Sequence, residues 1–300
     1  SGEIIKTAAP VKSTSTFELP PKFTEDDIYR VQATLIQHCE ERRDRIAIMD
    51  VPYAHAHNDK LGISGVSAWR SRFDTRYAAF YYPWMKVVNP FSDTSGEIIR
   101  DIPPSGHIAG QYARSDFAVG IHKAPANSPL IWIQDVTCHI NDEVHGIVNP
   151  LGINAIRPFP GRGIRIYGAR TMSSDPDWHY VNVQRLIMMI KKAVDVSIQW
   201  SVFEPNNYLT RAKIHLSLTT FLIHLWQRGA LMGKKMEEAF FVKCDGENNP
   251  QYERDNGRLI ADIGVAPSKP FEFVVLRIGR TENEYEITEM FNYAGGVSWQ

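Results

Sequence analysis

The sequence lacks a strong net charge and any long apolar run. Its 300 residues include 33 basic and 34 acidic side chains, which gives a formal net charge of −1. This balance provides no overall basic field that would attract nucleic acid or an anionic membrane. The apolar run Leu186–Ile190 ends at Lys191 and is far too short to span a bilayer. We therefore expect neither a nucleic-acid partner nor insertion into a membrane.

Cysteines are also scarce. The three of them, Cys39, Cys138 and Cys244, are far apart in the sequence and odd in number. They build neither a disulfide framework nor a Cys-x-x-Cys zinc pattern, and they suit a reducing compartment. The first 21 residues contain no apolar segment of the kind found in signal peptides, so we expect no signal peptide there.

Nucleotide-binding and hydrolase signatures are incomplete. Gly161, Gly163 and Gly168 do not have the G-x-G-x-x-G spacing of a dinucleotide site, and no P-loop or Gly-x-Ser-x-Gly motif occurs. A nucleotide-binding domain that uses Gly161 and Gly163 remains an alternative, but the β-branched segment that follows favours a hairpin turn. In a hairpin, the nearby arginines would form ion pairs in the core or between subunits; the candidates are Arg162, Arg165, Arg170, Asp175 and Asp177.

The most specific enzymatic candidate is the stretch "YAHAHNDK". His55, His57 and Asp59 match the first part of the H-x-H-x-D-H pattern of two-metal hydrolases. Alternating histidines on an extended segment place both imidazoles on one side, as a metal requires. However, Lys60 replaces the last histidine, and no later ligand has the expected context. A metal-dependent hydrolase is therefore the alternative function, and a polar loop is the simpler interpretation.

The order of periodic segments predicts an α/β chain of the mixed α+β type, with a mixed β-sheet flanked by helices. Thr24 and the acidic residues after it predict the start of a helix. Two long helices, near residues 180–200 and 207–228, are apolar on nearly all sides, so we expect both to be buried. We divide the chain into an extended arm (1–22), a core (23–280) and a C-terminal extension (281–300). Strands are expected at 45–52, 77–90, 154–160, 163–170, 238–244, 258–267 and 271–279, and a short helix capped by Ser105 is expected to run to Arg114.

Several long segments resemble the contractile tail sheath proteins of myophages, R-type pyocins and extracellular contractile injection systems. The matching pieces include "IPPSGHIAGQYARSD", "NPLGINAIRPFPGRGIRIYGARTMSSDPDWHYVNVQR", "QWSVFEPNN", "EEAFFVKCD" and "NGRLIADIGVAPSKPFEFVVLRIG". They follow the order found in that family and cover residues 42 to 279. The family's usual "PGVYVEE" start is absent, so the chain is expected to be a fragment or a shortened paralogue.

The resemblance implies a structural protein without enzymatic activity or cofactor. Sheath subunits form hexameric rings that stack helically around an inner tube and contract to drive the tube through a target envelope. The implied partners are other sheath subunits, paralogues included, the inner tube, the baseplate and the tail terminator. The implied location is a phage tail or injection-system particle assembled in the bacterial cytoplasm.

The resemblance also suggests which residues make these contacts. Terminal arms that add strands to a neighbour's sheet would lie at residues 3–7 and 285–291, and the acceptor sheet would include 271–279. A basic turn at 227–238 would face the tube. The expected arm and sheet residues are Tyr285, Ile287, Met290, Phe273 and Val275, and the expected tube-facing residues are Arg228, Lys234 and Lys235.

Overall fold

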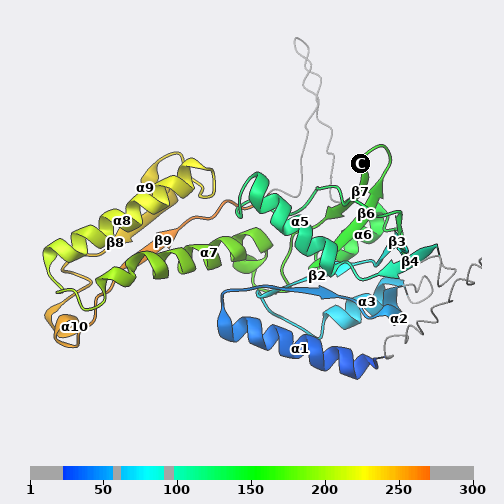
Figure 1. The fold of residues 1–300 in the computed structure, drawn as a ribbon, viewed down its shortest axis with the longest axis horizontal. Helices are drawn as coiled ribbons and strands as arrows, with labels where there is room; N and C mark the ends of the chain where they lie inside the picture. Colours follow the sequence, from blue (N-terminus) through cyan, green and yellow to red (C-terminus); the bar gives the residue numbers. More distant parts are fainter. Residues whose placement is uncertain (1–22, 57–61, 91–97, 271–300) are drawn as a thin grey trace, which may run out of the picture.

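The computed structural model describes residues 23–56, 62–90 and 98–270. These residues form two lobes joined through a long helix, α7 (Figure 1). The central lobe comprises residues 23–180 and the returning segment 266–270, and the C-terminal lobe comprises residues 181–265. The predicted arm at 1–22 and the predicted strand at 271–279 lie outside the described residues.

A four-stranded sheet forms the centre of the central lobe. Its strand order is β1-β2-β6-β7, with β1 (Ala47–Asp50), β2 (Ala78–Tyr82) and β6 (Ile153–Phe159) parallel. The last strand, β7 (Gly163–Tyr167), is antiparallel to β6 and forms a hairpin with it. The mixed sheet predicted from the sequence is therefore present.

Helices cover both faces of this sheet, and β2 is buried along its whole length. Phe80 and Tyr82 of β2 face a core shared with α1 (Glu25–Arg42), α3 (Gly62–Arg70) and α6 (Asp142–Val148). Ala79 and Tyr81 face the opposite core with α5 (Ser105–Ala118). Because successive strand residues point to opposite faces, a strand covered on both sides is apolar at every position, as the sequence of β2 is.

The helix expected after Thr24 is confirmed as α1. The Thr24 side chain accepts a hydrogen bond from the Asp27 amide, and the Asp27 carboxylate accepts one from the Thr24 amide. This capping box satisfies two amides that the helix leaves without partners, and the acidic first turn complements the helix dipole. The start of α1 was therefore predictable from local sequence alone.

The single strand expected at 77–90 is instead two strands. A cis peptide bond joins Tyr82 to Pro83, and β3 (Met85–Val88) leaves the main sheet. It pairs antiparallel with β4 (Ile99–Ile102) and β5 (Asp135–Val136) in a separate three-stranded sheet. Proline has no amide hydrogen to donate within a sheet, which explains why the pairing changes at this point.

The expected helix at Ser105 is present as α5, but it is longer than predicted and Ser105 is not its cap. Pro104 occupies the cap position without a side-chain hydrogen bond. The Ser105 amide instead donates to the Asp50 carboxylate at 3.0 Å. A residue 55 positions away in the sequence thus replaces the local cap, and it fixes the start of α5 to the end of β1.

The C-terminal lobe consists of two long helices and a two-stranded antiparallel sheet. Helix α7 (Val181–Ile198) ends in a short 3-10 helix, η2 (Gln199–Ser201), and α8 (Tyr208–Gln227) runs beside it. Strands β8 (Phe240–Lys243) and β9 (Asp262–Val265) pair in register Phe240 with Val265. The short helices α9 (Met236–Ala239) and α10 (Gln251–Asp255) lie at the two ends of this hairpin (Figure 1).

The expectation that both long helices are buried is wrong for α8 and for the second half of α7. Ile214, Leu218 and Leu222 of α8 are buried, but Leu209 and Leu216 are each 66% exposed. The sequence predicted a helix that is apolar on nearly all sides, and the described part of the chain covers one side of α8. The hairpin of β8 and β9 is too small to surround a 20-residue helix, so the other face of α8 remains at the surface.

Candidate functional site

The segment considered for metal binding does not have the geometry that the hydrolase alternative requires. His55 lies in a short helix, α2 (Tyr53–Ala56), rather than on an extended segment. Its Nε2 atom is 3.2 Å from the Glu25 carboxylate, and its ring packs against Trp69. His57 and Asp59 lie outside the described residues. Within the described part of the chain, no group of three or more His, Cys, Asp or Glu residues could hold a metal ion.

The Gly-x-Gly segment is a hairpin turn, as its sequence indicated. Gly161 and Gly163 have φ angles of 69° and 75°, and they connect β6 to β7. The Arg162 amide donates to the Phe159 carbonyl and closes the turn. Left-handed backbone of this kind favours glycine. The turn is followed by a strand instead of a helix N-terminus, so it offers no phosphate cradle of the dinucleotide type.

Two of the candidate arginines contact a neighbouring loop. Arg162 donates to the Asn127 side chain at 3.0 Å, and Arg165 donates to the Asn127 carbonyl at 2.7 Å. Asn127 has a φ of 54°, and the arginines help hold this left-handed residue against the hairpin. Within one subunit these arginines therefore fasten a loop to β7. Whether they also make ion pairs between subunits stays a prediction.

The remaining candidates lie at the meeting point of the two lobes. Arg170 donates to the Asn149 carbonyl at 3.1 Å and contacts His179. Asp175 caps the short helix η1 (Pro176–Trp178) by accepting from the Asp177 amide. The Asp177 carboxylate lies 3.8 Å from Lys269 in the segment that returns from the C-terminal lobe. These contacts order the chain between β7 and α7.

Sequence reasoning missed the ion pair that joins the lobes. Arg185 of α7 donates two hydrogen bonds to Asp116 of α5, at 3.0 and 2.5 Å. The Arg185 guanidinium also lies 4.7 Å from the centre of the Tyr112 ring, and the Tyr112 hydroxyl is 2.7 Å from that of Tyr81. Burial raises the pKa of Tyr112 to about 12, so its hydroxyl is neutral at physiological pH.

Asn182 reinforces the same junction. Its side-chain amide donates to the His122 carbonyl at 2.8 Å and to the Ser268 carbonyl at 3.1 Å, and the residue is 2% exposed. It therefore links α7 both to the loop after α5 and to the returning segment. Polar side chains with two or more buried partners fix one arrangement of the parts they join. These bonds hold α7, the loop after α5 and the returning segment in one arrangement within a subunit.

A second ion pair that the sequence did not reveal joins β6 to the start of α6. Arg157 donates to Asp142 at 2.6 Å and to the Ile140 carbonyl at 2.8 Å, although the sequence around it is apolar. An arginine in a buried strand needs such partners, because burying its charge alone is costly. The arginine inside "NAIRPF" was the available signal, but the sequence could not identify its partner.

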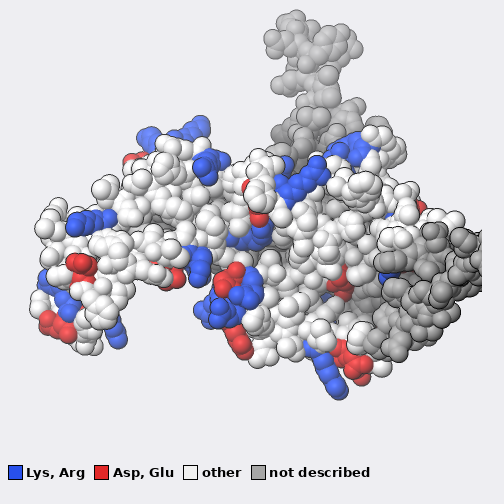
Figure 2. Space-filling view, in the orientation of Figure 1, with Lys and Arg blue, Asp and Glu red and all other residues white. Residues whose placement is uncertain are grey.

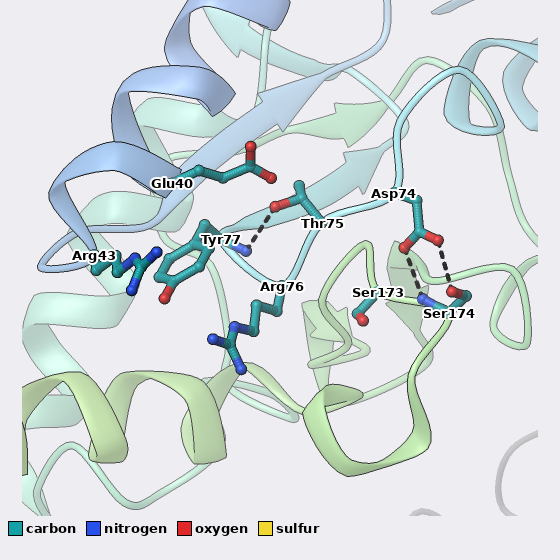
Figure 3. Close-up of a pocket in the computed structure, with 8 residues that line it drawn as sticks. All are labelled: Glu40, Arg43, Asp74, Thr75, Arg76, Tyr77, Ser173 and Ser174. Carbon is teal, nitrogen blue, oxygen red and sulfur yellow. Dashed lines mark hydrogen bonds between the residues drawn. The ribbon is translucent and has the colours of Figure 1, made fainter.

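A shallow polar cavity of about 470 Å³ is lined by the C-terminal end of α1, residues 74–77 and residues 173–174 (Figure 3). Asp74 accepts hydrogen bonds from the Ser174 amide and hydroxyl, and these bonds lower the pKa of the Asp74 carboxyl. Arg76 lies 4.1 Å from the Trp178 ring. The lining carries side chains of both charges, and the two bonds between Ser174 and Asp74 fasten the segment at 173–174 to the loop before β2. The lining residues are Glu40, Arg43, Asp74, Thr75, Arg76, Tyr77, Ser173 and Ser174.

The basic turn expected to face a tube is exposed at one end of α8. Arg228 is the C-cap residue, and Gly229 follows with a φ of 75°, as expected for a helix end. The Lys234 amide donates to Glu238 at 2.8 Å, which orders the turn and leaves the lysine side chain free to point outward. Arg228, Lys234 and Lys235 are exposed. Their contact with a tube stays a prediction.

The expected linking residues Tyr285, Ile287 and Met290, and the acceptor residues Phe273 and Val275, lie outside the described residues. Among the described helices, none has the length and apolar content needed to cross a membrane. Figure 2 shows basic and acidic side chains spread over both lobes and separated by wide uncharged areas.

Comparison with known proteins defines the family. The model for the phage tail sheath protein central domain matches residues 16–172, and the model for the phage tail sheath C-terminal domain matches residues 173–280. The chain belongs to the phage tail sheath protein family, whose members are structural and not enzymatic. The boundary between the two matches falls at the polar cavity and precedes α7, where the two lobes meet.

Individual relatives agree with this assignment. The tail sheath protein of Vibrio phage KVP40 is 23% identical over 269 residues, which is 83% of this chain and 39% of that protein. The tail sheath protein of Salmonella phage ViI is 23% identical over 295 residues, which is 96% of this chain and 45% of that protein. This chain therefore spans less than half the length of these two relatives.

Two solved structures have a higher sequence identity to this chain than these two relatives do. The sheath complex of an extracellular contractile injection system, PVC, in its contracted state superposes with a TM-score of 0.74 and 32% identity over 86% of this chain and 69% of that chain. A chain in the baseplate structure of the anti-feeding prophage superposes with a TM-score of 0.71 and 31% identity over 86% of this chain and 66% of that chain. The fold predicted from the sequence resemblance is therefore confirmed at the level of the family.

Proposed function

We propose that the chain is a subunit of a contractile sheath that polymerises as helically stacked hexameric rings around an inner tube. Contraction of this sheath drives the tube through a target envelope. The observation that carries the proposal is the 32% identity, over 86% of the chain, to a sheath complex in its contracted state. The subunits act inside a phage tail or injection-system particle that is assembled in the bacterial cytoplasm.

Rigid lobes suit this role. The Arg185–Asp116 pair and the Asn182 bonds hold the two lobes in one arrangement within a subunit. A sheath that changes length without unfolding its subunits must therefore change the packing between them. An open helix arises when one surface of a subunit binds a different surface of the next and the ring does not close. Two packings of the same interfaces, separated by a barrier, store the energy for contraction.

Strand addition links the subunits in this proposal. Within the described residues, β8 and β9 form a two-stranded sheet with one face packed against α8. Their outer edges carry main-chain groups that arms from neighbouring subunits satisfy by adding strands. The arms are assigned to residues 3–7 and 285–291, and main-chain hydrogen bonds of this kind persist while the lobes repack.

The tube is proposed to contact the basic turn. Arg228, Lys234 and Lys235 are exposed on one end of α8, and an acidic tube surface complements them. Charge reversal of Lys234 and Lys235 should weaken binding to the tube, and raised salt should weaken binding of the wild type. The baseplate and the tail terminator bind the two ends of the sheath.

Negative-stain electron microscopy of the native assembly tests the proposal. Striated hollow tubes are the expected result. A uniformly monodisperse monomer that carries stoichiometric zinc would overturn it and would favour the hydrolase alternative based on His55, His57 and Asp59.

A further inference from the structure

An exposed apolar surface lies at the end of the C-terminal lobe that is remote from the basic turn. We define it by five exposed residues at the start of α8 and in the loop before it, and we call it the α8 apolar face: Phe203, Tyr208, Leu209, Ala212 and Leu216. Leu209, Ala212 and Leu216 recur at intervals of three and four residues, so they occupy one side of the helix. Phe203 and Tyr208 are 103% and 75% exposed, and both leucines are 66% exposed. Within residues 23–56, 62–90 and 98–270, these side chains therefore lie at the surface.

The backbone at Phe203 supports a role for this face in binding. Phe203 has a φ of 70°, a left-handed conformation that bulky residues rarely adopt. The Val202 amide donates to the Gln199 carbonyl and the Glu204 amide donates to the Ser201 carbonyl, which together hold the loop in this shape. Strained residues of this kind persist where the surrounding structure enforces them, and they concentrate at functional sites. Here the result is an aromatic ring presented entirely to the outside.

The area of the face is appropriate for a protein partner. Complete burial of two aromatic side chains removes roughly 300–500 Å² from water, at about 150–250 Å² for each. One partner in a standard interface contributes about 800 Å². The α8 apolar face thus supplies a large share of such an interface, and aromatic residues are the usual anchors of interfaces.

We infer that the α8 apolar face binds a second copy of this chain, and this inference rests on the proposed sheath function. Contacts that generate an open helix need a second, different surface on the same molecule. The central lobe carries one: Phe117 is 94% exposed, and Trp132 is 85% exposed with a φ of 65°. The two exposed aromatic residues in left-handed backbone thus belong to different lobes, as a head-to-tail contact requires.

The α8 apolar face and the proposed tube contact lie at opposite ends of α8. Leu209 and Arg228 are 19 positions apart, which corresponds to about 28 Å at 1.5 Å per helical residue. The end of α8 at Arg228 carries the proposed tube contact, and the other end carries the exposed aromatic and apolar side chains together with Lys213. A tube bound at the Arg228 end leaves the other end for a different partner.

The test compares three forms of the chain. The double variant Phe203→Asn/Leu216→Gln removes two apolar side chains. Asparagine is chosen because it tolerates left-handed backbone, and glutamine is chosen because it is a good helix former. Val31→Gln on α1 is the matched control, since Val31 is 67% exposed and also lies in a helix. Assembly of each purified chain without tube is measured by sedimentation and electron microscopy, and folding is measured by thermal unfolding. We expect the double variant to need at least about tenfold more protein to assemble, with an unchanged unfolding temperature.

The outcomes separate the two proposals. If wild-type chain forms no tubular assembly, the proposed function fails and this inference fails with it. If wild type and double variant assemble alike, the inference fails and the proposed function stands. If the double variant then loses only its binding to the tube, the face contacts the tube instead of a second copy. A photo-cross-linker at position 203 of the otherwise wild-type chain adds a readout that does not depend on variant folding. Adducts between two copies support the inference, and adducts to another protein alone overturn it.

Discussion

The ion pair between Arg185 and Asp116 allows a quantitative prediction about the junction of the two lobes. We expect Arg185→Met to destabilise the chain, because it removes two hydrogen bonds and leaves the Asp116 carboxylate without its partner. Removing one member of a fully buried pair costs about 3–5 kcal/mol, and exposed pairs contribute about 0–1 kcal/mol. The Arg185 side chain is 11% exposed and that of Asp116 is 30% exposed, so water partly rehydrates the carboxylate.

The expected loss is therefore about 2–3 kcal/mol of unfolding free energy, intermediate between these limits. It includes about 0.5–1 kcal/mol from the contact between the guanidinium and the Tyr112 ring. For a chain of 300 residues, the loss corresponds to a decrease of about 3–5 °C in Tm. Urea titration and calorimetry measure the two quantities independently.

A matched control uses the exposed pair Lys243–Glu247. Lys243→Met should leave Tm within about 1 °C of the wild type, since exposed pairs of this spacing contribute little. The double variant Arg185→Met/Asp116→Asn should be less destabilised than the sum of the single variants, because neither charge is then left unpaired. The reasoning is refuted if Arg185→Met loses no more stability than Lys243→Met, or if the single effects add.

Three further predictions concern other parts of the chain. Burial raises the pKa of Asp50 from 3.8 to about 6, so the folded state binds its proton more tightly than the unfolded state. The resulting contribution to the unfolding free energy is complete below pH 4 and is lost as the pH rises through 6. The total loss is up to about 3 kcal/mol. Asp50→Asn should abolish that slope in urea titrations between pH 4 and 6, and a persistent slope would exclude Asp50 as its source. Gly163→Ala should lower the unfolding free energy by about 1–2 kcal/mol, because alanine is strained at a φ of 75° even though open space surrounds the position. The control is Gly146→Ala in α6, which also lies in open space and should cause no loss of stability in the same thermal scan. Deleting residues 282–300 should leave a folded, soluble core but impair polymerisation in sedimentation assays, and normal contractile tubes from the truncated chain would show that this tail is not the linking arm.

Local signals in the sequence predicted the elements whose causes are local. The capping box at Thr24, the glycine turn between β6 and β7 and the end of α8 at Gly229 depend on residues within a few positions of one another. Strands β8 and β9 followed from turn-bounded, β-rich segments, although their pairing was not predicted. In each case the physical cause lies inside the segment, so a single sequence contains it.

Features that depend on distant partners were not predictable in this way. Asp50 replaces Ser105 at the start of α5, and Arg185 finds Asp116 across 69 positions. The exposed face of α8 was predicted to be buried, since apolar spacing on a helix shows that a face needs cover but not whether the same chain supplies it. The tube-facing and arm assignments rest on the family resemblance and stay predictions.

Cryo-electron microscopy of particles built from this chain, before and after triggering, tests the central claim most directly. We expect two helical lattices in which the subunit keeps its fold and the Arg185–Asp116 contact, while the packing between subunits differs. A lattice that is unchanged after triggering, or a change in length produced by separation of the two lobes within each subunit, would contradict the account.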